Sequence, residues 1–171
     1  MLLFTPSAWC ETVLLQEPMT ELSRGCLKFI EHGSEEYEQA AQLRYRLFYQ
    51  SHKIPFESIF DDRERQDIHV AITNSQDNRV LAYGRLAQNS PTEYQIYQMV
   101  VEPECQGQGF GARILQALIE AAVERGANRL VLKARVSQVG FYQKLGFSPV
   151  GEVFASLATG VPHVAMQKKL M

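Results

Sequence analysis

Residues 99–126, MVVEPECQGQGFGARILQALIEAAVERG, place a glycine-rich loop between an apolar strand pattern and an amphipathic helix pattern. Glycines stand at 107, 109 and 111. Glycine has no Cβ, so the backbone amides of such a loop can approach a ligand closely, and the N-terminus of a following helix favours an anion there. The stretch therefore predicts a strand, an anion-binding loop and a helix in direct succession.

The helix expected over residues 112–126 carries one apolar face. Its members repeat at i, i+1, i+4, i+5, i+8 and i+9: Ile114, Leu115, Leu118, Ile119, Ala122 and Val123. This spacing is typical of a helix packed on a core, and Gly126 is well placed to end it in a left-handed conformation.

Working outward, alternating or buried apolar runs predict strands and helical spacing predicts two more helices. The expected strands are 26–31, 68–73, 80–88, 93–101, 129–134, 149–156 and 163–170, and the expected helices are 35–50, capped by Ser34, and 138–146. This order predicts an α/β (α+β) fold with a mostly antiparallel sheet of about six to seven strands, about four helices and one parallel strand pair. We expect Arg44 and Arg46 to lie off the apolar face of the first helix, and the run DDRER (61–65) to form a solvated loop.

Length and composition indicate one globular domain. A chain of 171 residues with 46% hydrophobic residues can bury one good core, so we expect an N-terminal extension over 1–25 and a single domain over 26–171. The formal charge is −2 and no stretch concentrates Lys and Arg. Nucleic-acid and membrane partners are therefore disfavoured.

The three cysteines, Cys10, Cys26 and Cys105, are widely spaced and lack the CxxC or CxxH pattern of a metal site. They predict neither a disulfide framework nor a zinc site, which favours a reducing, cytoplasmic location and no metal. The apolar N-terminus has no basic leader region and is interrupted by Pro6 and Glu11. It is not typical of a targeting or transmembrane segment.

Two phosphate-binding interpretations of the glycine loop meet difficulties. A P-loop needs GxxxxGK[ST], whereas Gly111 is followed by Ala112 and Arg113. A dinucleotide fingerprint is satisfied by Gly107, Gly109 and Ala112, and Arg135 could suit a 2′-phosphate, but residues 127–135 hold no carboxylate for a ribose. Only residues 136–171 remain after Arg135, too few for the rest of a doubly wound sheet.

A third interpretation comes from resemblance. Residues 99–126 resemble the acetyl-CoA motif of the GNAT superfamily of N-acetyltransferases, whose core Q/R-x-x-G-x-G/A corresponds to residues 106–111. FYQKLGF (141–147) resembles the second hallmark of that superfamily, and the likeness covers about residues 26–170. The segments LRYRLFYQSHKIPFE (43–57), AYGRL (82–86) and GVPHVAM (160–166) are most similar to the ElaA-like branch. Gln98 departs from the basic residue expected in closer relatives.

The resemblance implies acetyl-CoA as co-substrate, with no metal. It implies that strand 98–101 carries a bulge and splays from strand 129–134, so that pantetheine enters between them while the loop amides hold the pyrophosphate. An amide near Val100 or Val101 would stabilise the thioester oxygen. The implied cofactor-binding residues are Met99, Val100, Val101, Gln106, Gly107, Gln108, Gly109, Phe110, Gly111, Ala112, Phe141 and Tyr142.

The resemblance makes Tyr142 the candidate general acid that protonates the departing thiolate, the alternative being that Phe141 and Tyr142 only pack a short helix. Glu102, His69 and His163 are candidate bases for the amine. Each also has an ordinary structural explanation, as a loop carboxylate or as a histidine at a strand end.

Candidate acceptor-binding residues are Arg44, Tyr49, Asp61, Arg85, Gln98 and His163. Arg44 and Arg85 interrupt apolar patterns and could bind a substrate carboxylate, although ion pairing within the protein would explain them equally. The expected function is acetyl transfer to a primary amine of a small molecule or, in second place, of a protein. The alternative is a non-catalytic CoA-binding sensor or interaction module. A homodimer is one expected assembly for this superfamily.

Overall fold

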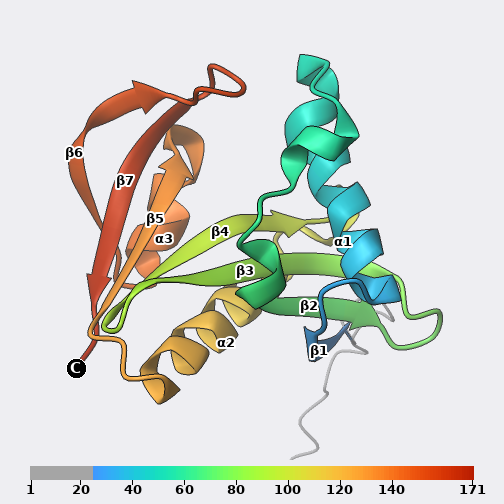
Figure 1. Cartoon of the computed structure of the whole chain (residues 1–171), viewed down its shortest axis with the longest axis horizontal. Helices are drawn as coiled ribbons and strands as arrows, with labels where there is room; N and C mark the ends of the chain where they lie inside the picture. Colours follow the sequence, from blue (N-terminus) through green and yellow to red (C-terminus); the bar gives the residue numbers. More distant parts are fainter. Residues whose placement is uncertain (1–24) are drawn as a thin grey trace, which may run out of the picture.

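The computed structural model describes residues 25–171, which form one seven-stranded sheet with three α-helices (Figure 1). The strands are β1 (Gly25–Ile30), β2 (Ile68–Asn74), β3 (Val80–Ser90), β4 (Glu93–Val101), β5 (Arg129–Arg135), β6 (Ser148–Ala155) and β7 (Pro162–Lys169). The α-helices are α1 (Glu35–Arg44), α2 (Phe110–Glu124) and α3 (Val139–Lys144). The predicted N-terminal extension, together with Cys10, lies outside the described residues, apart from Gly25.

The strand order is β1-β2-β3-β4-β5-β7-β6, and every neighbouring pair is antiparallel except β4 and β5. The predicted mostly antiparallel sheet with one parallel pair is therefore confirmed. A parallel pair needs a crossover, which α2 provides. Figure 1 shows α2 beneath the sheet and α1 on the opposite face, so the sheet is covered from both sides.

Helix α2 packs its predicted apolar face on the sheet. Ile114, Leu115 and Leu118 are fully buried, whereas Val123, expected on this face, is 47% exposed because it lies in the last turn of the helix. Gly126 follows the helix with φ of +81°, the predicted left-handed stop.

Helix α1 starts as predicted, since the side chain of Ser34 accepts a hydrogen bond from the amide of Tyr37. It continues as the π-helical segment η2 (Tyr45–Tyr49) and a 3-10 turn, η3 (Gln50–His52), before reaching residues 53–67. Two expectations here are wrong. Arg44 is fully buried, and Glu64, in the run expected to be solvated, is 1% exposed, because the 3-10 turn η5 (Glu64–Gln66) carries its carboxylate inward to Arg44.

Strand β4 contains the predicted bulge. Tyr83 pairs with Val100 and Arg85 pairs with Tyr97, so Gly84 alone faces two residues, Gln98 and Met99. Gln98 adopts φ of +52°, a left-handed conformation. Pairing of β4 with β5 ends at Ile96 and Leu132, and beyond that point the two strands separate, as expected.

Candidate active site

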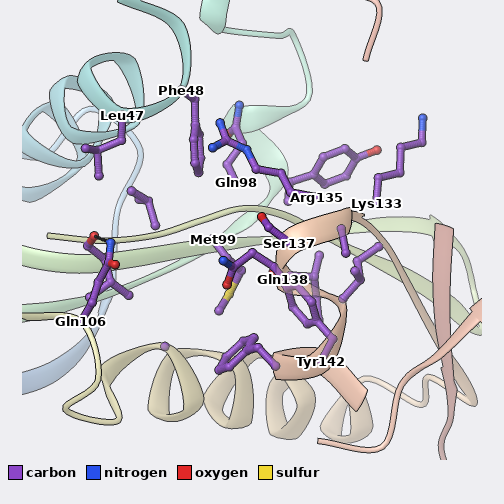
Figure 2. A pocket seen from close by; sticks show the side chains of 18 of the residues that line it. Leu47, Phe48, Gln98, Met99, Gln106, Lys133, Arg135, Ser137, Gln138 and Tyr142 are labelled. Carbon is purple, nitrogen blue, oxygen red and sulfur yellow. Dashed lines mark hydrogen bonds between the residues drawn. The ribbon is translucent and has the colours of Figure 1, made fainter. Parts of the chain in front are cut away.

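A cleft of about 720 Å³ opens where β4 and β5 separate (Figure 2). Its walls come from η2, the bulged half of β4, the glycine loop, the end of β5, α3 and the β6–β7 loop. The lining residues predicted from the sequence are Tyr49, Gln98, Met99, Val100, Val101, Gln106, Gly107, Gly109, Phe110, Gly111, Ala112, Phe141, Tyr142 and His163. Most of the implied cofactor set is therefore brought to one place.

The glycine loop presents backbone amides to this cleft. Gly107 and Gly109 have φ of +76° and +83°, and no atom lies within 4 Å of where a Cβ would stand. Gly109 caps α2 without any side-chain hydrogen bond, and the Arg113 amide makes the 3.0 Å bond to the Gly109 carbonyl. The amides of residues 110–112 therefore lack acceptors within the helix, which creates a site for an anion.

Of the two glutamines predicted at the loop, Gln106 lines the cleft and Gln108 does not. Gln106 lines the cleft and donates from Nε2 to the carbonyl oxygen of Val101 over 3.2 Å, which ties the loop to β4. Gln108, also predicted to contact the cofactor, donates to the carbonyl of Glu104 and does not line the cleft.

The geometry of β4 distinguishes the amides of Val100 and Val101. The Glu102 amide donates to Leu81 of β3 over 2.8 Å. Successive amides of a strand point to opposite sides, so the Val101 amide points away from β3, toward the side where β5 has separated. The Val101 carbonyl points the same way, since Gln106 reaches it. Val101 therefore aims an amide into the cleft, while the Val100 amide faces β3.

Tyr142 lies on α3 and lines the cleft below β5 (Figure 2). Its ring makes edge contacts with Phe141 and Phe147 at centroid separations of 5.0 and 6.0 Å. Burial disfavours the phenolate and raises the pKa of Tyr142 to about 12. The side chain is therefore a neutral hydroxyl donor throughout the physiological range.

His163 is the one candidate base that lines the cleft. It pairs with Arg135 across β5 and β7, and its ring stacks on Phe154 at 6.1 Å. Nδ1 lies 2.7 Å from the carbonyl oxygen of Val161. A carbonyl only accepts, so Nδ1 carries the hydrogen and the neutral ring keeps its lone pair on Nε2.

The other two candidate bases lie elsewhere. Glu102 pairs with Arg46 at 2.6 Å and lines a separate hollow beside α1. His69 is 2% exposed and uses both ring nitrogens at 2.7 Å, since Nε2 donates to the Glu64 carbonyl and Nδ1 accepts from the Tyr83 hydroxyl. Its burial lowers the pKa of His69. Neither residue lines the cleft in the structure.

Arg44 and Arg85 belong to a buried ion cluster behind the cleft wall. The Glu64 carboxylate forms ion pairs with Arg44 at 3.2 Å and with Arg85 at 2.8 Å. Arg85 forms two more ion pairs, with Asp61 at 2.7 Å and with Asp67 at 3.2 Å. Neither arginine lines the cleft, and Asp61 does not either. The cluster instead supports cleft residues, because Arg44 donates to Gln98 and the Arg85 guanidinium lies 4.8 Å from the centre of the Tyr97 ring.

Two basic cleft residues were not predicted to bind the acceptor. Lys133 and Arg135 line the cleft from β5, and the Arg135 guanidinium stacks 4.7 Å from the centre of the Phe48 ring. The sequence contained a signal for them, because Leu130, Leu132 and Ala134 alternate with these two residues and are buried in the core. Alternation in RLVLKAR thus assigns both cations to the opposite face of the strand.

The charge of the cleft is one-sided. Within residues 25–171, its lining contains no Asp or Glu. In the same part of the chain no three His, Cys, Asp or Glu side chains gather as a metal site would require, and no helix is both long and apolar enough to cross a membrane.

Comparison with known proteins decides the family. Residues 34–170 match the profile of the acetyltransferase (GNAT) domain. The chain belongs to the GNAT acetyltransferase family. The uncharacterized N-acetyltransferase YjcF of Bacillus subtilis is 26% identical over 139 residues, which are 81% of this chain and 96% of YjcF. Protein ElaA of Escherichia coli is 25% identical over 134 residues, 76% of this chain and 85% of ElaA.

Solved structures show the same GNAT fold. The crystal structure of Escherichia coli ElaA superposes with a TM-score of 0.70 at 22% identity, covering 85% of this chain and 99% of ElaA. An aminoglycoside 6′-N-acetyltransferase complexed with coenzyme A superposes with a TM-score of 0.66 at 17% identity, covering 85% of this chain and 97% of the acetyltransferase. The expected resemblance to GNAT proteins and to ElaA is thus confirmed.

Proposed function

We propose that this GNAT protein is an N-acetyltransferase that passes an acetyl group from acetyl-CoA to a primary amine by direct attack in a ternary complex. The observation that carries the proposal is the cleft itself, in which an anion-binding loop, the Val101 amide and the Tyr142 hydroxyl face one space. The acetyl-CoA thioester supplies an activated acetyl group and a thiolate leaving group.

The cleft fits acetyl-CoA as a co-substrate. The unpaired amides at the start of α2 suit its pyrophosphate, and the lack of a cleft carboxylate within the described chain avoids repulsion of that charge. The separated edges of β4 and β5 offer strand-like backbone groups to the amides of pantetheine. The residues that would hold it are those of the loop, with Met99, Val101 and Phe141.

Val101 and Tyr142 supply the groups that the transfer needs. The Val101 amide would stabilise the negative charge that develops on the thioester oxygen when the amine attacks. Tyr142 would donate its proton to the departing sulfur. A phenol with a pKa of about 12 is a weaker acid than a thiol with a pKa of about 8.5, so complete proton transfer to the sulfur is uphill by itself. It would be completed when the Tyr142 phenolate that it leaves regains a proton from water.

His163 is the base that we assign. Its position in the cleft and its Nε2 lone pair suit removal of a proton from the amine, directly or through water. Cys105 also lines the cleft but is fully buried, which raises the pKa of its thiol. A protonated thiol is a poor nucleophile, which favours direct transfer over an acetyl-cysteine intermediate.

The alternative is a CoA-binding sensor without turnover, favoured by the displacement of Glu102 and His69 from the cleft. Thermal shift with CoA and acetyl-CoA, combined with thiol release across a panel of amines, separates the two. Stabilisation together with amine-dependent thiol release supports the enzyme. Stabilisation without thiol release from any amine supports the sensor, and no stabilisation would refute both.

A further inference from the structure

We propose that the acceptor is an amine that also carries an oxyanion, a carboxylate or a phosphate, and that Arg135, assisted by Lys133, binds it. The inference rests on the proposed function and specifies the acceptor. The bulge in β4 gives the cleft two sides, because Met99 and Gln98 face opposite ways there. The Sδ of Met99 approaches Gly84 together with Ile114 of α2, so Met99 faces α2, whereas Gln98 faces Arg44 of α1.

The basic residues lie on the α1 side of this division. Lys133 and Arg135 alternate with Leu132 and Ala134, which are buried in the same core cluster as Ile114 of α2, so both cations project from the opposite face of β5. His163 stands beside Arg135 in the antiparallel pair and shares its face. The proposed base and the two cations therefore share one side of the cleft, and Tyr142 lies on the other.

These cations are separated from the anion site of the loop. Figure 2 shows Gln106, beside the loop, at the opposite side of the pocket from Lys133, with Gln98 and Arg135 between them and above Met99. The α2 N-terminus already provides amides for the pyrophosphate. The positive charge of Lys133 and Arg135, at the other end of the cleft, therefore suits a second anion that belongs to the acceptor.

Arg135 is prepared to receive such a group. It is half-buried, and Phe48 stacks on its guanidinium plane at 4.7 Å, which restrains the side chain but leaves the edge N–H donors uncovered. Lys133 is similarly placed 5.8 Å from the centre of the Phe154 ring. No hydrogen bond or ion pair to either cation is formed by the other residues between 25 and 171.

Charge also argues against cationic acceptors. A polycation would meet Lys133 and Arg135 without any carboxylate among the described cleft residues to compensate. The likeness in fold to the aminoglycoside 6′-N-acetyltransferase therefore does not imply that this cleft accepts a polycationic substrate. We expect kanamycin to be a poor acceptor.

The test uses two pairs of amines that differ by the anion: tryptophan against tryptamine, and O-phosphoethanolamine against ethanolamine. We expect the anionic member of at least one pair to have the higher kcat/KM, by about tenfold to a hundredfold, and the pair that shows it identifies the anion. Arg135→Gln should bring that ratio close to one while leaving the KM for acetyl-CoA unchanged. Arg129→Gln, which removes a guanidinium from the same face of β5 at its other end, is the matched control and should keep the ratio.

Thermal shift in the presence of CoA makes the result independent of turnover. The anionic amine should raise the melting temperature of the wild type and of Arg129→Gln, and should not raise that of Arg135→Gln. Such a shift without any thiol release would refute the proposed transferase and keep the anion site. The inference is overturned if both pairs favour the uncharged-tail amine, or if neither anionic amine gives a shift that depends on Arg135.

Discussion

Arg44 donates a hydrogen bond from Nη1 to Oε1 of Gln98. The donor is a fully buried guanidinium of the ion cluster, and the acceptor is the bulge residue of β4, with φ of +52°. The contact connects the packing of α1 to the strand that forms one wall of the cleft. The cluster therefore supports the cleft wall through Gln98, while neither Arg44 nor Arg85 lines the cleft itself.

Replacing Gln98 separates side-chain and backbone contributions. Gln98→Gly and Gln98→Ala both remove the acceptor for Arg44, but only glycine tolerates a left-handed φ without strain. We expect both variants to be less stable than the wild type. The free energy of unfolding, measured with urea, should be higher for Gln98→Gly than for Gln98→Ala by about 1 kcal/mol. Equal stability of the two variants would refute the strained bulge.

Removal of the Tyr142 hydroxyl tests the acid. Tyr142→Phe keeps the ring contacts with Phe141 and Phe147, so we expect a fall in kcat of about a hundredfold with little change in acetyl-CoA affinity. Because burial raises the pKa of Tyr142 to about 12, the wild-type enzyme should show no loss of kcat from this group up to about pH 10. Unchanged turnover in Tyr142→Phe, measured by thiol release, would remove this residue from the mechanism.

His163→Gln tests the base. In His163→Gln we expect kcat/KM for the amine to be lower by about tenfold to a hundredfold, because the variant lacks the Nε2 lone pair that would accept the amine proton. His69→Gln is a useful comparison, since His69 does not line the cleft. A His163→Gln variant with the wild-type kcat/KM would show that another group accepts the proton.

Asp67 makes the stability of the fold depend on pH. Burial raises the pKa of Asp67 to about 6 despite the nearby Arg85. The folded state thus favours the protonated acid, so this contribution to stability is complete below the unfolded pKa of 3.8 and is lost as pH rises through about 6. Asp67→Asn should gain stability relative to the wild type between pH 4 and pH 7, by up to about 3 kcal/mol. Urea unfolding at both pH values measures this, and a constant difference would contradict it.

Most of the fold could be predicted because its signals are local. Apolar alternation located the strands, Ser34 and Gly126 marked helix ends, and the glycine loop located the start of α2. Most residues at the cofactor end of the cleft are also close together in the sequence, within residues 99–112. Their likeness to a known motif then identified them together.

The acceptor end is assembled by long-range packing, which one sequence does not reveal. Arg44 and Arg85 interrupt apolar patterns whether they face a substrate or a buried partner, and the partner, Glu64, lies in a segment without strong periodicity. Arg135 and His163 are adjacent only because β7 inserts beside β5. Strand alternation indicated which face Arg135 occupies, but not what lies opposite.

A single-turnover experiment with isotopically labelled acetyl-CoA, quenched at successive times and analysed by mass spectrometry of both protein and amine, tests direct transfer most directly. We predict that the label passes to the amine without appearing on the protein, and that Cys105→Ala, which removes the cleft thiol, gives the same result. Label that appears first on the protein and then on the amine would contradict direct attack.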